Sequence, residues 1–191
     1  MSHPATAAIP RSSDIPLATF TIERAVAAPP PRVWEVITDW AAYARWMPLT
    51  TMRRDPGPTG VGWSFAGLTG VGRLRFSDVM RITDWAPPAD MGSGTFRLVK
   101  VGHLLAGWAE VSVVPVANGE QTQLVWRENI VIRPVVLGRL LVPLTDRINR
   151  VVFARAVDAM AAEAVRASAQ NATGQPDPGQ PDPGQPDPGR R

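Results

Sequence analysis

PPPRVWEVITDWAAYARWMP, residues 29–48, places three tryptophans and a tyrosine within one short stretch of the chain. The aromatic residues are Trp34, Trp40, Tyr43 and Trp46. One amphipathic helix needs fewer large aromatic side chains than this to dock on a core. The stretch therefore raises the question of whether these side chains only pack a core or also line a space inside it.

The three prolines that open this stretch predict where its first helix begins. Proline suits the first turn of a helix, where the N–H groups have no partners within the helix. Apolar residues then recur at helical spacing, and the helix is predicted to end near Asp39. Its anchoring face is predicted to contain Val33, Trp34, Val36 and Ile37. A second short helix, AAYARWM (41–47), is predicted to stop at Pro48.

The composition is that of one globular domain. Of the 191 residues 45% are hydrophobic, and 20 basic against 17 acidic residues give a net charge of +3, too small to indicate nucleic-acid binding. The absence of cysteine excludes disulfides and cysteine ligands, and two histidines, His3 and His103, are too few for a usual zinc site. We therefore expect no metal and no cofactor. No segment has the pattern of a signal peptide or a membrane span, so we expect a cytoplasmic protein without stable membrane insertion.

Two tails flank the predicted domain. Residues 1–17 are rich in Ser, Ala and Pro, and residues 168–191 repeat QPDPG three times. Proline and glycine at this density permit neither helix nor sheet. We therefore expect disordered tails at 1–17 and 168–191, and one folded domain at 18–167.

Most of the domain alternates between apolar and polar residues, as half-buried strands do. Strands are predicted at 18–28, as two short pieces within 50–67, at 72–88, at 94–102 and as a hairpin at 107–134. A helix is predicted at 136–167. Pro143 should break or kink it, with Thr145 or Asp146 as the N-cap of the main segment.

The register of the predicted hairpin follows from Asn118-Gly119, a strong signal for a two-residue turn. With these residues as the loop, one face of the hairpin pairs Val113 with Leu124, Val111 with Trp126 and Ala109 with Glu128. On the other face Glu110 opposes Arg127, a favourable ion pair that belongs in water. The charge match supports the register and places Glu128 on the apolar face.

The same alternation places Asp78 and Lys100 on faces that are otherwise apolar. Their apolar companions are Leu74, Phe76, Met80 and Ile82 beside Asp78, and Phe96 and Leu98 beside Lys100. A few polar groups on an apolar concave face are what a small-molecule pocket uses to orient its ligand. The sequence therefore predicts a pocket that contains Asp78, Lys100 and Glu128.

Other interpretations of these charged residues stay open. They could reach solvent at the mouth of a barrel, and Lys100 could form a Schiff base if burial lowered its pKa. His103, in GHLLAG (102–107), is either an exposed loop residue or a general base at the pocket mouth.

The order of elements and the early motif resemble the START-like or SRPBCC superfamily, in its bacterial polyketide cyclase/dehydrase branch. The motif residues are Val33, Trp34, Asp39, Tyr43, Trp46 and Pro48, which match that family's "Vw…l.D…y..W.P" pattern. The later ITDWAPP (82–88) and the hairpin AEVSVVPVANGEQTQLVW (109–126) fit its middle and late strands. The resemblance covers residues 18–167.

This resemblance implies an α+β helix-grip fold, in which a curved antiparallel sheet wraps around a long C-terminal helix and encloses a cavity. Members bind hydrophobic small molecules, and some cyclise or dehydrate polyketides. We expect Trp34 in the core and Trp46 at the pocket mouth. The full set of expected ligand-binding residues is Trp46, Phe65, Phe76, Met80, Phe96, Leu98, Lys100, Val111, Trp126 and Phe153.

Three functions are compatible with the residues. The first is a carrier or sensor that binds a lipid, a polyketide or a quinone-like molecule. The second is a cyclase or dehydratase with Glu128, Asp78 or His103 as acid–base groups and Arg97 or Lys100 holding an oxygen. The chain departs from an aromatase site because Tyr43 is its only tyrosine. The third is a protein-interaction module that uses outward arginines, although the sequence identifies no protein partner.

Overall fold

The computed structural model describes residues 18–47, 49–133 and 135–172, without the side chains of Ala18, Leu74, residues 135–146 and Ala172. The predicted N-terminal tail, 1–17, and residues 173–191 of the predicted C-terminal tail, 168–191, lie outside the described residues. Seven antiparallel strands form one sheet in the order β1-β7-β6-β5-β4-β3-β2. Their bounds are β1 Ala18–Val26, β2 Thr50–Arg54, β3 Ser64–Val71, β4 Leu74–Ala86, β5 Gly94–Val101, β6 Leu105–Val116 and β7 Gln121–Ile132.

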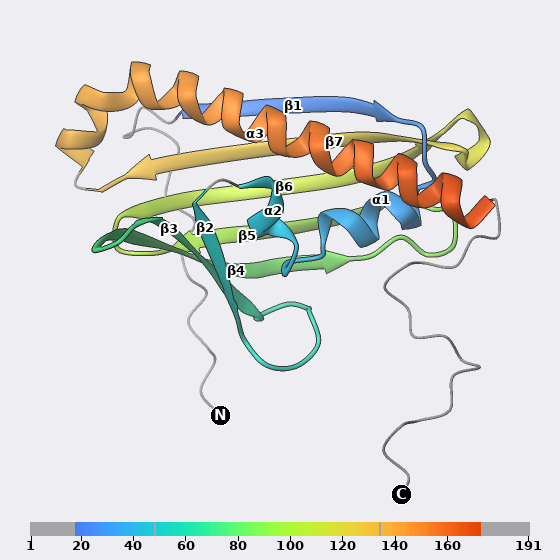
Figure 1. Ribbon diagram of the computed structural model, residues 1–191, viewed down its shortest axis with the longest axis horizontal. Coiled ribbons are helices and arrows are strands. Elements are labelled where there is room, and N and C mark those ends of the chain that lie inside the picture. Colours follow the sequence, from blue (N-terminus) through green and yellow to red (C-terminus); the bar gives the residue numbers. More distant parts are fainter. Residues whose placement is uncertain (1–17, 48, 134, 173–191) are drawn as a thin grey trace, which may run out of the picture.

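Three α-helices lie on one face of this sheet (Figure 1). They are α1 Pro30–Ile37, α2 Tyr43–Trp46 and α3 Val135–Ala172. Figure 1 shows α3 running lengthwise over β1 and β7, with α1 and α2 beside it above the middle of the sheet. The predicted α+β arrangement of a curved antiparallel sheet with a long C-terminal helix is confirmed.

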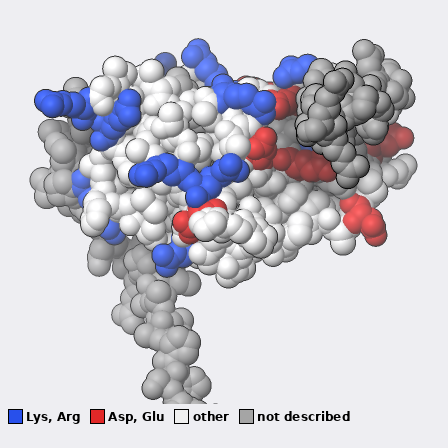
Figure 2. Space-filling view, turned by 60° about the horizontal axis from the view of Figure 1, so that its bottom comes forward, with Lys and Arg blue, Asp and Glu red and all other residues white. Residues whose placement is uncertain are grey.

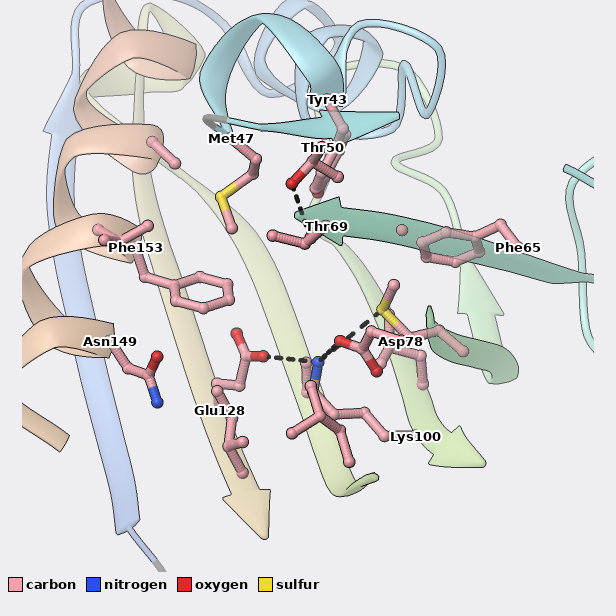
Figure 3. Close-up of a pocket in the computed structure, with 18 of the residues that line it drawn as sticks. Tyr43, Met47, Thr50, Phe65, Thr69, Asp78, Lys100, Glu128, Asn149 and Phe153 are labelled. Carbon is pink, nitrogen blue, oxygen red and sulfur yellow. Dashed lines mark hydrogen bonds and ion pairs between the residues drawn. The ribbon is translucent and has the colours of Figure 1, made fainter. Parts of the chain in front are cut away.

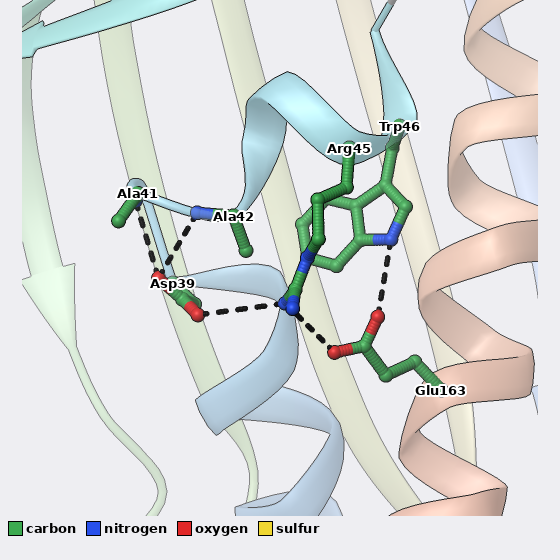
Figure 4. Close-up of polar contacts among 6 residues, drawn as sticks. All are labelled: Asp39, Ala41, Ala42, Arg45, Trp46 and Glu163. Atoms are coloured by element: carbon green, nitrogen blue, oxygen red, sulfur yellow. Dashed lines mark hydrogen bonds and ion pairs between the residues drawn. The ribbon is translucent and has the colours of Figure 1, made fainter. Parts of the chain in front are cut away.

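The first helix begins where its prolines predict and anchors on the core. Its buried residues are Pro30, Val33, Trp34, Val36 and Ile37. At the end of α1 the Asp39 carboxylate accepts hydrogen bonds from the backbone N–H groups of Ala41 and Ala42, each at 3.1 Å (Figure 4). This side-chain cap turns the chain from α1 into α2.

The short helix α2 is held to α3 by Glu163. One carboxylate oxygen of Glu163 accepts a hydrogen bond from Trp46 Nε1 at 3.2 Å, and the other lies 2.9 Å from Arg45 Nη2 (Figure 4). Arg45 also lies 3.8 Å from Asp39. A helix of four residues is too short to be stable alone, so these contacts position it.

An aromatic cluster fills the core between α1 and the centre of the sheet. Phe96 is fully buried, and its ring centroid lies 5.7 Å from that of Trp34, 5.5 Å from that of Trp40 and 6.4 Å from that of Trp126. Trp34 is buried in this cluster, as expected. All three contacts are edge-on, a geometry that aromatic quadrupoles favour.

The β6–β7 hairpin has the predicted register but not the predicted turn. Val111 pairs with Trp126 and Ala109 with Glu128. The turn is a 3₁₀ segment, Ala117–Gly119, rather than a two-residue loop, and regular pairing resumes at Val116 and Gln121. Because the longer loop is centred on the same Asn118-Gly119 pair, the register is unchanged.

The C-terminal helix is longer and more continuous than predicted. It runs through Pro143 without interruption and ends at Ala172 rather than at residue 167. Thr145 and Asp146 lie within its backbone, so no separate helix begins there. Figure 1 shows the first turns of α3 at an angle to the rest, as a kink would place them. Among the described residues, none of the helices carries an apolar run sufficient for a transmembrane span.

Charged side chains lie mainly on the outside of the molecule. Arg73, Arg75 and Arg81 are exposed, as the strand alternation predicts. On the face in Figure 2, basic side chains spread over the left and centre, and acidic side chains lie mainly at the centre and right. Lys100 and Glu128, which are buried, and Asp78, whose side chain is 15% exposed, are exceptions.

Gly107 on β6 provides a test of the fold. Its φ is +125°, and a Cβ atom there would lie 2.0 Å from the backbone oxygen of Asn129. We expect Gly107→Ala to lower the free energy of unfolding by at least about 2 kcal/mol, measured by urea denaturation. Gly60→Ala, where a Cβ atom meets nothing within 4 Å, is the control and should change it by less than about 0.5 kcal/mol. Equal stability of the two variants would contradict this backbone conformation.

Candidate functional site

A cavity of about 420 Å³ lies between α3 and the concave face of the sheet. Its walls come from β2–β7, the α2 region and one face of α3. Most of the lining side chains are aliphatic, aromatic or methionine. Nine of the residues that the sequence assigned to the site line this cavity: Phe65, Phe76, Asp78, Met80, Leu98, Lys100, Trp126, Glu128 and Phe153.

The polar centre of the cavity is a cluster of Asp78, Lys100 and Glu128 (Figure 3). Lys100 Nζ lies 2.6 Å from Asp78 Oδ2 and 3.1 Å from Glu128 Oε1. The side chains of Lys100 and Glu128 are only 3% and 2% exposed, so this is a buried ion-pair network. The Lys100 ammonium lies between the two carboxylates and is shared by them.

Small residues on β6 allow Lys100 to reach Glu128. Lys100 on β5 and Glu128 on β7 are separated by β6, and strands two apart lie roughly 10 Å from each other. On β6, Gly107 lies opposite Lys100 and Ala109 lies opposite Glu128. Glycine has no side chain and alanine has only a methyl group, so little fills the space above the strand. The lysine side chain crosses that space and meets the carboxylate.

Hydrogen bonds satisfy most of the cluster. Trp126, two residues before Glu128 and on the same face of β7, donates its Nε1–H to Glu128 Oε2 at 2.9 Å. Lys100 Nζ also lies 3.9 Å from Met80 Sδ, a weak third contact. Asp78 Oδ1 is buried and has no hydrogen-bond partner among the described residues. The cluster thus leaves one carboxylate oxygen unused.

The electrostatics of the cluster are dominated by burial. Burial raises the pKa of Glu128, and the Lys100 charge and the Trp126 hydrogen bond only partly offset this effect. Burial by itself would lower the pKa of Lys100, but the Glu128 and Asp78 carboxylates outweigh it, so the pKa of Lys100 is raised. Lys100 therefore remains an ammonium at neutral pH. This argues against the Schiff-base role, which needs a neutral amine.

Several cavity residues were not among the predicted site residues. Trp40 lines the cavity, is 3% exposed, and has an Nε1–H without a partner in the described part of the chain. Tyr43, in the wall beside α2, donates its hydroxyl to the backbone oxygen of Ile37 at 3.1 Å. Burial raises the pKa of Tyr43 well above its usual value, and the Glu128 charge adds a smaller effect in the same direction. Asn149 of α3 and the hydrogen-bonded pair Thr50 and Thr69 add polar groups to the wall. The first helical stretch pointed to Tyr43, but the polar residues of α3 and β2–β3 carry no recognisable signal.

Four predicted site residues do not line the cavity. Phe96 and Val111 are completely buried in the core, because their inward positions on the central strands are covered by other side chains. Trp46 donates its Nε1–H to Glu163 of α3 and is not among the lining residues. His103 is exposed in the β5–β6 connection, and its neighbour Leu104 faces the cavity.

Arg97, the other residue considered for holding an oxygen, is not among the lining residues. Its guanidinium stacks over the Trp108 ring at 5.4 Å from the centroid. Arg97 lies three residues before Lys100 on β5, and because side chains alternate along a strand it is on the other face of the sheet. Two of the described lining residues, Phe76 and Leu104, are 38% and 39% exposed, so the cavity wall reaches the surface at these side chains.

Comparisons with known proteins agree with this architecture. The model of the family described as "Polyketide cyclase / dehydrase and lipid transport" matches residues 18–172. The Zhui aromatase/cyclase from Streptomyces sp. R1128 is 22% identical with a TM-score of 0.57, over 79% of this chain and 97% of that one. A protein from Thermus thermophilus is 16% identical with a TM-score of 0.57, over 78% and 99%. The di-domain ARO/CYC StfQ of the steffimycin biosynthetic pathway is 13% identical with a TM-score of 0.55, over 83% and 52%. No curated protein sequence matches the chain. The structural likeness confirms the helix-grip fold.

Lys100→Met tests the buried cluster. Removing the ammonium leaves two carboxylates without their cation, which should lower the free energy of unfolding by roughly 3–5 kcal/mol in urea titrations at pH 8. Arg127→Met, which breaks the exposed pair with Glu110, is the control and should cost at most about 1 kcal/mol.

The cost of Lys100→Met should also depend on pH. Without Lys100 the pKa of Glu128 rises further, because the largest effect that lowers it is gone. A folded-state pKa above the unfolded value favours folding at low pH, and this contribution is lost as the pH rises through the folded pKa. The deficit relative to the wild-type protein should therefore be smaller at pH 5 than at pH 8. A pH-independent deficit would contradict the cluster.

Proposed function

The chain belongs to the polyketide cyclase/dehydrase and lipid transport family, as its early aromatic motif indicated, and on that premise we propose that it binds a hydrophobic small molecule as a carrier or sensor. The observation that carries the proposal is the cavity beneath α3. Its volume of about 420 Å³ lies within the usual range of small-molecule sites, roughly 300–1,000 Å³. Apolar walls with one polar cluster favour a ligand with an apolar body and a polar end.

The state of the polar groups favours binding over catalysis. The Lys100 ammonium is engaged by two carboxylates, and the Tyr43 hydroxyl is engaged by a backbone oxygen. His103, the only histidine among the described residues, lies outside the lining. Proton transfer needs a group within hydrogen-bond reach of the substrate, so the described lining offers mainly the two carboxylates.

Filling the cavity tests ligand binding. Ala156 on α3 is buried and lines the cavity. We expect the wild-type protein to bind the uncharged probe N-phenyl-1-naphthylamine saturably, with increased probe fluorescence. Ala156→Phe should weaken this binding at least about tenfold, because the added ring occupies the ligand volume. Ala162→Leu, at an exposed position of α3, is the control and should bind normally. Unchanged binding by a folded Ala156→Phe variant would place the probe elsewhere.

A second candidate function is polyketide cyclisation and dehydration. Two of the similar structures are aromatase/cyclases, and one observation on this chain favours such chemistry. Glu128 is buried, lines the cavity and has a raised pKa, the combination that suits a carboxyl group to act as general acid or base.

Glu128→Gln tests the catalytic candidate, because the amide keeps the shape of the side chain but cannot transfer the proton. We expect that, if the wild-type protein converts a poly-β-ketone thioester to a cyclised and dehydrated product, the variant loses at least about 10²-fold in rate. Mass spectrometry and absorbance of the aromatic product measure this, and Glu120→Gln, at an exposed position near the hairpin turn, is the control. Equal rates for Glu128→Gln and the wild-type protein would remove Glu128 from the chemistry.

A further inference from the structure

We infer that the ligand presents a hydrogen-bond donor without negative charge, an alcohol, a phenol or an amine, to Asp78 Oδ1, and that the cavity rejects carboxylates. This inference rests on the proposed binding function and specifies its ligand. It depends on three features of the buried cluster: the engagement of the lysine, the unused carboxylate oxygen and the sum of the charges.

The strong contacts of the Lys100 ammonium are with carboxylates of the protein. An ammonium group has three N–H donors. Its Nζ lies 2.6 Å from Asp78 Oδ2 and 3.1 Å from Glu128 Oε1, and its further contact is the weak one with Met80 Sδ at 3.9 Å. A ligand carboxylate would meet the ammonium only on its Met80 side, beside two carboxylates that already neutralise its charge.

The free hydrogen-bonding capacity of the cluster is that of an acceptor. Asp78 Oδ1 is buried without a partner among the described residues, whereas both Glu128 oxygens have donors, Lys100 on one and Trp126 on the other. A buried acceptor without a partner costs roughly 1–3 kcal/mol. The Asp78 side chain is 15% exposed, so a rotation of its carboxylate that turns Oδ1 to the cavity would let a ligand donor recover part of that free energy. A ligand hydroxyl or amine can supply this donor.

The charges of the cavity also disfavour anions. Among its described lining residues, Asp78, Glu128 and Lys100 are the charged ones. If both carboxyls are ionised the cluster carries one net negative charge, and if Glu128 binds a proton the cluster is neutral. In neither state is there a positive excess to hold an anion, and repulsion in a buried site is screened little.

Four naphthalenes that share one apolar body test the inference: 2-naphthol, 2-naphthylmethylamine, 2-methoxynaphthalene and 2-naphthoate. Binding is measured at neutral pH by isothermal titration calorimetry and by displacement of N-phenyl-1-naphthylamine. We expect 2-naphthol or the amine to bind at least about tenfold more tightly than 2-naphthoate, and severalfold more tightly than 2-methoxynaphthalene, which lacks the donor. The ranking of 2-naphthol against the amine identifies the donor that the site prefers.

Asp78→Asn should change the selectivity. If the amide oxygen stays on Lys100, the amide NH₂ replaces Oδ1, so a donor stands where an acceptor stood, and the negative charge is removed. We expect 2-naphthoate to gain about tenfold relative to 2-naphthol in this variant. Asp90→Asn removes the same charge at an exposed loop position with a φ of +48°, which asparagine tolerates, and should leave the selectivity unchanged.

The outcomes separate this inference from the proposed function. If the wild-type protein binds 2-naphthoate or 2-methoxynaphthalene as tightly as the better donor ligand, the inference is wrong while ligand binding stands. If neither the four naphthalenes nor N-phenyl-1-naphthylamine binds to the protein, the proposed function is wrong and the inference is wrong with it. The ranking for the wild-type protein decides the question even if Asp78→Asn does not fold.

Discussion

The arrangement of the cavity depends on the ion pairs that the buried Lys100 ammonium forms with Asp78 and Glu128. A charge removed from water is tolerated only where partners of opposite charge and good geometry surround it. Lys100 lies on β5, and its partners come from the adjacent strand β4 and from β7, two strands away. The strand between β5 and β7 is β6, which carries the small residues Gly107 and Ala109 opposite Lys100 and Glu128. The register of four strands, the glycine at position 107 and the hydrogen bond from Trp126 all contribute to this one site. The cluster therefore couples the sheet register to the chemistry of the cavity.

The aromatic residues of the opening stretch divide between the core and the cavity wall. Trp34 packs against Phe96 and Trp85 on the core side. Trp40 and Tyr43 stack with ring centroids 5.4 Å apart and face the cavity, and Trp46 joins α2 to α3. Large rigid rings pack densely on one side and leave a shaped surface on the other. Trp40 Nε1 and Asp78 Oδ1, both without partners among the described residues, belong to side chains that line this surface. Buried polar groups without a partner are rare in native proteins, and a functional role is one of the reasons for which they are kept.

Alternation along the strands explains how far the site could be predicted. A period of two assigned Asp78, Lys100 and Glu128 to the inner face, and the charge match of Glu110 with Arg127 supported the hairpin register. The same rule could not tell which inward residues meet a cavity and which meet other side chains. Phe96 and Val111 face inward but belong to the packed core and do not line the cavity. The sequence left His103 open between an exposed loop and the cavity mouth, and the structure places it in an exposed loop. Trp46 and Arg97 are not among the lining residues, because their contacts with Glu163 and Trp108 depend on how distant segments pack.

The sequence by itself determined the order of the elements, the faces of the strands and the family, because these follow from local periodicity and from a motif of fixed spacing. It also limited the charged groups available on the inner face. Only the tertiary structure decided that these groups meet in one cluster, since they lie on three strands and come together through the small residues of β6. Hydrogen-bond geometry and burial, which no residue spacing records, determine that the cluster keeps its lysine charged and leaves an acceptor on Asp78. The aromatic stretch identifies the fold, and the buried charges are the basis of the proposal about its ligand.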